Sequence, residues 1–333
     1  EDWITKKFGK KLYEIFFKSY SEKLWGISCK ELSADFAAQR IKKFSLGEAI
    51  KSIFLKKNNH KTLVDEFAYP NGGTGYFYEK LSKKFNAIGG NLFLNTKIEK
   101  IQFNKNEIEL VINNEKQNYD YLISSMPITD LVNYLDPDEN TKNSVQKLKF
   151  RNTLLVYVNI NTESLFNDQW IYVNSNDIKS GRITNFNNWK QKNNYGNTIL
   201  CFEYWFNDED DIWKNQEKII DITKNDIKKL SMFNANQIED YKIIPIRKCY
   251  PVYDMDYKEN LKQVKKFLSN FTNVIPIGRY GSFKYNNQDH SILMGILASE
   301  KISRDNTINL WDINTDYEFQ EKAIITETGL KKI

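Results

Sequence analysis

The feature of this sequence that most restricts its fold is an apolar run that ends in a glycine and leads into a helix. The run is Val274–Ile277, and the stretch GRYGSFKYNNQDHSI, residues 278–292, follows it directly. The run predicts a strand, and the pattern after it predicts a helix from about Asp289 to Ile302. In α/β folds, the junction between a strand and a helix N-terminus is a natural site for an anion or a cofactor.

The rest of the chain alternates between helical and extended patterns, which predicts an α/β (α+β) fold with more than one domain. Further helices are predicted at 3–20, 34–44, 46–55, 213–230 and 260–268, and one more after a glycine-rich turn at 70–75. Strands are predicted at 92–94, 98–103, 108–112, 119–124, 153–160, 170–173, 182–186, 198–206 and 242–253. No internal repeat is visible.

Charge, cysteine spacing and hydropathy exclude several classes of protein. The formal net charge is +5, from 48 Lys+Arg against 43 Asp+Glu, and it is too spread out for a nucleic-acid-binding surface. Cys29, Cys201 and Cys249 lie far apart without metal-ligand spacing, so neither a disulfide framework nor a zinc site is expected. This cysteine pattern fits a reducing compartment and predicts a cytoplasmic location. No apolar run reaches the ~18 residues of a membrane-spanning helix, so no transmembrane segment is expected.

The charged residues of the junction allow two interpretations each. Arg279 offers a planar, permanently charged fork to a phosphate or an electron-rich ring, or it forms a buried structural ion pair. Asp289 contacts a ligand, or it only caps the helix. His290 fits a helix-start residue better than a catalytic base. No nucleophile–base pair and no paired carboxylates stand out, so no catalytic side chain is assigned.

Several segments together resemble a known group of proteins. IGRYGSFKYNNQDHSILMGILASEKI at 277–302 resembles the C-terminal flavin-binding segment of the FAD-dependent amine oxidase superfamily, which includes protoporphyrinogen-oxidase-like proteins and UDP-galactopyranose mutases. Internal segments of the same proteins are similar, in the same order, to KSYSEKLWGISCKELSADFAAQRI (18–41), YPNGGTGYFYEKL (69–81), NTKIEKI (95–101), YLISSMP (121–127) and YPVYDMDYKENL (250–261). The resemblance covers nearly the whole chain and implies FAD as the cofactor.

The superfamily resemblance also implies a domain organisation. It implies an incomplete Rossmann-like FAD-binding domain, a mixed-sheet substrate domain and a helical lobe. The expected boundaries are 1–66 for the helical lobe, 67–150 for part of the FAD-binding domain, 151–255 for the antiparallel-sheet substrate domain, 256–310 for the C-terminal FAD-binding segment and 311–333 for a tail.

The mutase branch of the superfamily supplies the expected site residues. Its pattern of Gly-Arg, an aromatic and a basic residue, Tyr and then Asp resembles the residues Gly278, Arg279, Phe283, Lys284, Tyr285 and Asp289. The implied cofactor contacts are Ile98, Gly278, Arg279, Asp289 and Met294. The implied substrate contacts are Arg182, in GRITNFNNW at 181–189, and also Tyr250 and Tyr285. Strand packing is the alternative for Tyr250.

One departure from the superfamily matters for function. The N-terminal βαβ unit of these proteins carries a Gly-x-Gly-x-x-Gly turn that holds the FAD diphosphate, and this sequence has no such turn. The resemblance implies that the chain begins about one such unit into the family pattern, or further, and that it alone has lost most of its affinity for FAD.

Three functions therefore remain open. The leading one is an FAD-dependent oxidoreductase whose flavin N5 acts on a small molecule in an aromatic, Arg-containing pocket. The second is a nucleotide-sugar mutase in which Arg182 and Arg279 hold a substrate diphosphate. The third is a non-catalytic remnant, or a subunit that binds a partner through an exposed sheet edge. The sequence leaves the oligomeric state open, a homo-oligomer included.

Overall fold

The structure is a computed structural model, and it describes residues 1–35, 69–104, 107–189, 196–304, 306–313, 323–326 and 329–332. The predicted helices at 34–44 and 46–55 fall almost wholly outside these residues. The chain forms two compact units. The first comprises Glu1–Ala37, Lys43–Lys84 and Phe150–Cys249, and the second comprises Ala38–Lys42, Phe85–Lys149 and Tyr250–Ile333.

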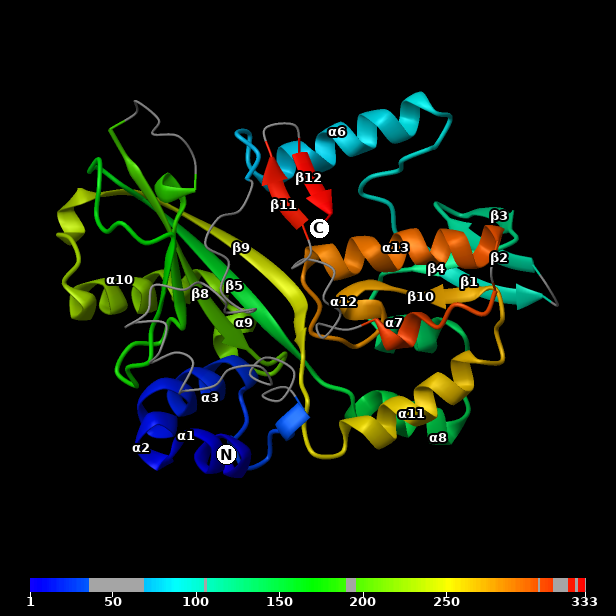
Figure 1. Cartoon of the computed structure of the whole chain (residues 1–333), viewed down its shortest axis with the longest axis horizontal. Helices are drawn as coiled ribbons and strands as arrows, with labels where there is room; N and C mark the ends of the chain where they lie inside the picture. Colours follow the sequence, from blue (N-terminus) through cyan, green and yellow to red (C-terminus); the bar gives the residue numbers. More distant parts are fainter. Residues whose placement is uncertain are drawn as a thin grey trace. The chain divides into compact units, whose positions relative to one another are not determined.

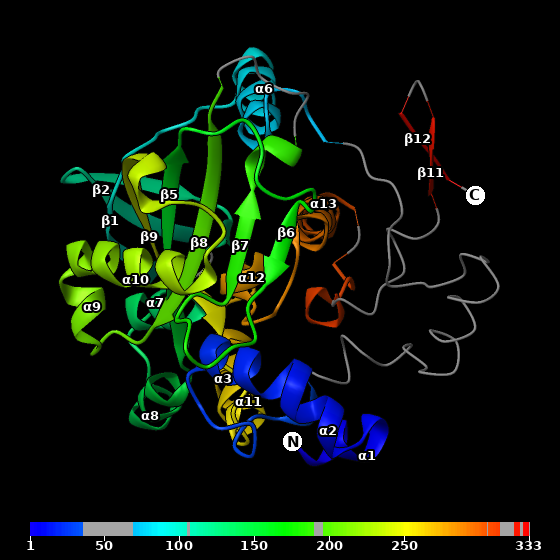
Figure 2. The same cartoon turned by 90° about the vertical axis from the view of Figure 1, so that its left-hand side faces the viewer.

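A five-stranded sheet forms the centre of the first unit. Its strand order is β6 (Trp170–Tyr172), β7 (Arg182–Asn185), β8 (Thr198–Phe206), β5 (Phe150–Ile160) and β9 (Ile238–Pro251). The β6–β7, β7–β8 and β8–β5 pairs are antiparallel. Figure 2 shows these strands side by side, with α10 (Ile219–Leu230) lying across one face of the sheet.

The face of this sheet under α10 is the hydrophobic core of the first unit. Alternate residues of β5, such as Leu154 and Val156, are fully buried there together with Phe202 of β8 and Ile227 of α10. This alternation is the period of two that a half-buried strand requires. The intervening residues of the same strands lie on the second face, which matters for the site described below.

The N-terminal helical region is broken where one helix was expected. It consists of α1 (Asp2–Phe8), α2 (Lys10–Leu12), a π-helical segment η1 (Tyr13–Lys18) and α3 (Ser19–Trp25). Gly9 separates the first two with φ 84°, outside the helical region. The prediction of one continuous helix over 3–20 is therefore wrong. The predicted helix at 213–230 is likewise three pieces: α9 (Asp211–Lys214), η3 (Gln216–Lys218) and α10.

The second unit contains a three-stranded meander and a short parallel pair. The meander is β1 (Ile98–Asn104), β2 (Glu107–Ile112) and β3 (Glu115–Tyr119), paired antiparallel. The parallel pair is β4 (Leu122–Ser124) with β10 (Val274–Pro276). The helices of this unit are α7 (Ile128–Tyr134), α8 (Glu139–Lys147), α11 (Tyr257–Leu268), α12 (Gly278–Gly281) and α13 (Gln288–Ser303).

The junction between β10 and α13 is built as the sequence predicts. Figure 1 shows α13 running alongside β10 and β4. Ile275 of β10 packs in one buried cluster with Met294 and Ala298 of α13. The predicted helix from about Asp289 to Ile302 agrees with α13 to within one residue at each end.

The remaining elements complete the described chain. They are α6 (Thr74–Ala87), η2 (Phe186–Asn188), η4 (Ala235–Gln237), η5 (Leu310–Asp312), β11 (Ala323–Thr326) and β12 (Gly329–Lys332). The helix predicted after the glycine-rich turn is confirmed by α6.

The strand predicted at Leu92–Leu94 is not formed. Leu92, Phe93 and Leu94 are 46%, 71% and 74% exposed, and no described strand pairs with them. An apolar run satisfies its backbone as a strand only beside a partner strand. The prediction at 119–124 is wrong in part, because β3 ends at Tyr119 and β4 begins at Leu122.

Candidate active site

The candidate site of the second unit starts at the carboxyl end of the β4–β10 pair. Ile277, just after β10, donates its backbone N–H to the carbonyl of Ser124 at 2.9 Å. The next residue, Gly278, has φ 74°, a conformation that a residue with a Cβ rarely adopts. The carboxyl ends of parallel strands are where α/β folds bind ligands, so the backbone turns away from the sheet at a natural binding position.

Gly281 lets α12 approach β4 closely, and this contact gives a testable prediction. A Cβ at Gly281 would lie 2.6 Å from the carbonyl oxygen of Ser124 and 3.3 Å from that of Met126. We expect Gly281→Ala to lower the free energy of unfolding by about 1 to 3 kcal/mol, because the backbone has to shift.

Gly295 is the matched control for this substitution. It lies in α13, and a Cβ there would meet no atom within 4 Å. Gly295→Ala should stabilise the protein by about 0.5 to 1 kcal/mol, since alanine is the better helix former. Urea denaturation of both variants tests the contact, and equal stability changes of the same sign would contradict it.

An arginine and two tyrosines meet beside this turn, and we call Tyr250, Arg279 and Tyr285 the arginine–tyrosine triad. The Cζ atom of Arg279 lies 4.5 Å from the ring centroid of Tyr250 and 4.4 Å from that of Tyr285. The two rings stack at 5.6 Å with an angle of 27° between them. The guanidinium therefore lies over both rings rather than between them, and each ring face stabilises its positive charge.

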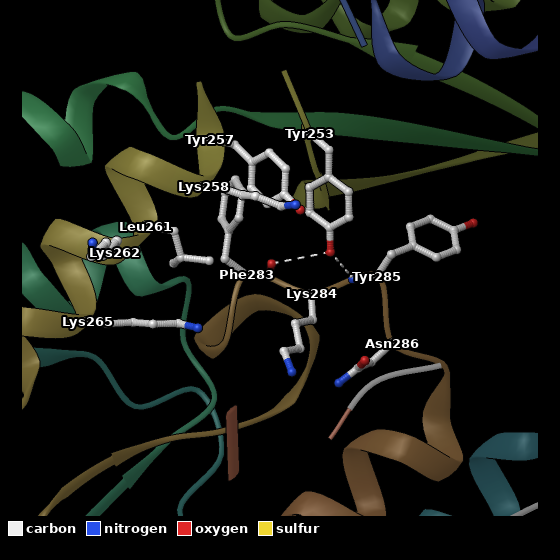
Figure 3. Close-up of a pocket in the computed structure, with 10 residues that line it drawn as sticks. All are labelled: Tyr253, Tyr257, Lys258, Leu261, Lys262, Lys265, Phe283, Lys284, Tyr285 and Asn286. Atoms are coloured by element: carbon white, nitrogen blue, oxygen red, sulfur yellow. Dashed lines mark hydrogen bonds between the residues drawn. The ribbon is translucent and has the colours of Figure 1, made fainter. Parts of the chain in front are cut away.

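The loop that carries Tyr285 is fixed by a third tyrosine. The hydroxyl of Tyr253 accepts the N–H of Tyr285 at 2.9 Å and donates to the carbonyl of Phe283 at 3.4 Å, as Figure 3 shows. Phe283 is fully buried and has a positive φ of 52°. Ser282 donates its hydroxyl to the carbonyl of Gly278. These bonds hold the loop, and with it the ring of Tyr285, in one conformation.

The expected cofactor contacts of the second unit have different environments. Asp289 lies in the first turn of α13, with one carboxylate oxygen 3.0 Å from Nδ1 of His290. The N-cap of α13 is Asn287, so the interpretation of Asp289 as the cap is wrong. Met294 is fully buried in the core, so its side chain packs against Ile275 and Ala298 and is not exposed to a ligand. Ile98 begins β1, and its carbonyl accepts the hydroxyl of Tyr134 at 2.8 Å.

Arg182 belongs to the first unit and lies on the second face of its sheet. Its Nε and Nη2 atoms donate to Oε1 of Glu203 at 2.8 and 2.5 Å. Glu203 is its cross-strand partner on β8, and the side chain of Arg182 remains 32% exposed. The carboxylate of Glu203 holds the guanidinium through Nε and Nη2, and Nη1 takes no part in this ion pair.

Aromatic rings gather on the same face of the first unit, and sequence reasoning missed them. Tyr157 stacks on Phe186 at 5.7 Å, and Trp170 stacks on Trp189 at 5.6 Å. The pKa of Tyr157 is raised to about 12, mainly by burial and secondarily by the neighbouring Cys201, so its hydroxyl stays neutral at ordinary pH. The alternation of side chains along β5 and β7 could have revealed this aromatic face, because it assigns Tyr157 and Arg182 to the side of the sheet opposite the core.

Comparisons with known proteins show the family and the fold of this chain. The sequence profile of the family of flavin-containing amine oxidoreductases matches residues 5–244. The chain belongs to this family. Among curated proteins, a sequence search finds no match.

Solved structures show the fold of this family member. Reduced UDP-galactopyranose mutase has a TM-score of 0.74 at 20% identity, over 90% of this chain and 66% of the mutase chain. A putative protoporphyrinogen oxidase from Exiguobacterium sp. 255-15 has a TM-score of 0.58 at 16% identity, over 84% of this chain and 61% of that one. A Pyrococcus furiosus protein has 0.59 at 12% identity, over 93% and 68%. The chain thus spans about two thirds of the length of these proteins.

Family membership confirms two predictions for this flavoprotein, namely the superfamily and FAD as its cofactor. The α/β fold is confirmed as well. Within the described part of the chain, no helix is both long and apolar enough for a membrane crossing. The same residues contain no cluster of histidine, cysteine and acidic side chains suited to a metal ion.

Proposed function

We propose that this chain supplies the substrate-binding and flavin-ring side of an FAD-dependent enzyme whose substrate is an anion. The observation that carries the proposal is the guanidinium of Arg279 over the rings of Tyr250 and Tyr285. A permanent positive charge in a half-buried aromatic setting attracts phosphate or carboxylate, and it repels the protonated amine that an amine oxidase would bind.

Among anionic substrates, a nucleotide sugar fits best, which favours the mutase hypothesis over the oxidoreductase hypothesis. The likeness to UDP-galactopyranose mutase supports the fold on which such a site is built. A diphosphate uses the fork of an arginine, and a planar base uses aromatic faces. Within the first unit alone, the second face of the sheet has the same combination of groups, namely Arg182 together with the stacked pairs of Tyr157 with Phe186 and Trp170 with Trp189.

The residues at the β10–α13 junction fit the ring side of FAD. There is room beside Gly278, because a Cβ at this position would have its nearest neighbours at 4.0 Å. Its φ is positive as well. The carboxylate of Asp289 would accept hydrogen bonds from ribityl hydroxyls, because a phosphate at that position would be repelled. The flavin supplies the reactive N5, while Arg279, Tyr250 and Tyr285 orient the substrate and limit the access of water.

Binding of the FAD diphosphate needs a further polypeptide segment. No Gly-x-Gly-x-x-Gly turn occurs in the sequence. In the described residues, β4 and β10 form a sheet of only two parallel strands, and the apolar run Leu92–Leu94 is exposed. Parallel sheets are normally larger and covered on both faces. We therefore include in the proposal that a glycine-rich α/β segment completes this sheet when FAD binds.

Absorbance and titration test the proposed function directly. The chain extended upstream in its gene should show the flavin band near ~450 nm, and this chain alone should bind added FAD weakly. The extended protein should bind UDP, and Arg182→Lys should weaken UDP binding by about tenfold through loss of the planar fork. A colourless extended protein would reject the flavoenzyme proposal. Unchanged UDP affinity in Arg182→Lys would reject the role of Arg182.

A further inference from the structure

A cavity of about 300 Å³ in the second unit is bordered by the 283–286 loop, and its lining includes Tyr285 of the arginine–tyrosine triad. One wall is a single face of α11, with residues 257, 258, 261, 262 and 265, and the other is the loop together with Tyr253. In Figure 3 the ring of Tyr285 points away from the lysines of α11, while Phe283 stands on their side. This one loop thus contributes side chains both to the triad and to the cavity.

The charge of this cavity is one-sided. Its ten lining residues include the lysines Lys258, Lys262, Lys265 and Lys284, and they include no acidic residue. In Figure 3 Lys258 and Lys265 extend from α11 toward the loop. Four ammonium groups around so small a space repel one another, and an anion among them would remove that repulsion.

Two of these lysines are held in place and partly withdrawn from water. Lys284 donates to the carbonyls of Trp311 and Ile313, the latter at 2.6 Å. Nζ of Lys265 lies 4.4 Å from the ring centroid of Trp311. Burial, and then the nearby Lys265, lowers the pKa of Lys284 to about 8, while Asp312 opposes the shift. An ammonium fixed by carbonyls but poorly neutralised is preorganised to receive an anion.

The remaining walls are aromatic and aliphatic. Tyr257 stacks on Tyr253 at 4.5 Å, and Phe283 lies 6.4 Å from Tyr257 in a nearly parallel orientation. Leu261 and these rings line the cavity and supply an apolar surface beside the ammonium groups. The volume suits a molecule with one ring and one phosphate and is too small for a dinucleotide.

We propose that this cavity is a binding site for a small phosphate monoester that carries a planar ring, and that it adjoins the site of the triad, with which it shares Tyr285. The phosphate lies among the lysines, and the ring lies against Tyr257 and Phe283. Because Phe283 and Tyr285 belong to the same short loop, a ligand there also fixes the loop that carries a residue of the triad. The proposal does not depend on the function proposed above.

Calorimetric titration of the whole protein with three probes tests the site. Phenyl phosphate should bind about tenfold more tightly than inorganic phosphate, because its ring buries apolar surface. Phenol, which lacks the charge, should not bind measurably. Equal affinity for phenyl phosphate and inorganic phosphate, or no binding of phenyl phosphate at millimolar concentration, would overturn the proposal.

Matched lysine variants locate the binding. Lys262→Gln, at an exposed position, should weaken phenyl phosphate binding several-fold, and the double variant Lys262→Gln, Lys265→Gln should weaken it by about tenfold or more. Lys266→Gln is the control, because Lys266 lies exposed on α11 outside the cavity lining. Equal weakening by Lys266→Gln would mean nonspecific attraction. Loss of binding in Arg182→Lys, with full affinity in the double variant, would place the ligand in the first unit. Either result rejects the site.

Discussion

Asp226→Ala is expected to destabilise the protein by about 3 to 5 kcal/mol, because it leaves several buried donors without their acceptor. Asp226 of α10 is fully buried. Its carboxylate accepts the backbone N–H of Lys179 at 3.0 Å and that of Ser180 at 2.8 Å. It also accepts the hydroxyl of Tyr204 at 3.2 Å. One side chain therefore ties the helix to the loop before β7.

A half-buried lysine makes the loss larger. Nζ of Lys23 donates to the carbonyls of Val173 at 2.9 Å, Ser175 at 2.7 Å and Ser180 at 3.3 Å, in the same loop. Burial lowers the pKa of Lys23 to about 8, and Asp226 opposes that shift. Without the carboxylate, the ammonium of Lys23 keeps its desolvation penalty and loses its compensating charge.

Urea denaturation measures the effect, with Asp221→Ala as the matched control. Asp221 lies on the same helix with a side chain 88% exposed, so its replacement should change the free energy of unfolding by less than about 0.5 kcal/mol. The loss of unfolding free energy in Asp226→Asn should lie between those of Asp226→Ala and Asp221→Ala, since an amide oxygen still accepts hydrogen bonds but carries no charge. A loss of under about 1 kcal/mol in Asp226→Ala would show that water or neighbouring groups replace the carboxylate.

The strand-to-helix junction could be predicted because its signals are local. The apolar run Val274–Ile277, the glycine after it and the apolar spacing of α13 all fall within 30 residues of chain and agree with one another. The cap of α13 was the exception. Asp289 and Asn287 both suit a helix start, and only the backbone shows that Asn287 precedes the first turn.

The residues that the sequence did not reveal act through distant partners. Glu203 is 21 positions from Arg182, and their ion pair depends on the register of β7 with β8. Tyr253 looks like a strand residue in an apolar segment, yet its hydroxyl fixes a loop 30 residues away. Leu92–Leu94 has the composition of a strand, but strand formation depends on a neighbour that composition does not encode.

If the chain has the function proposed above, Arg279→Lys should reduce UDP affinity and kcat/KM of the FAD-loaded protein by about a hundredfold, the largest functional effect among the substitutions considered. The Cζ atom of Arg279 lies 4.5 and 4.4 Å from the ring centroids of Tyr250 and Tyr285, and a guanidinium held on two rings can still bind an oxyanion through its N–H groups. A lysine ammonium is a compact charge that can approach one ring but cannot stack on both, so its position relative to the substrate is lost.

Substitutions of Tyr250 separate the contribution of the arginine's charge from the contribution of the ring that supports it. Tyr250→Phe keeps the ring face and should cost less than about threefold, whereas Tyr250→Leu removes one support of the guanidinium and should cost about tenfold. Arg304→Lys, at an exposed position just after α13, is the control and should behave as the wild type. If Arg279→Lys retained full UDP affinity while Tyr250→Leu lost it, the ring rather than the charge would bind the substrate. The case for an anionic substrate would then fail, and an uncharged substrate of an oxidoreductase would fit the site better.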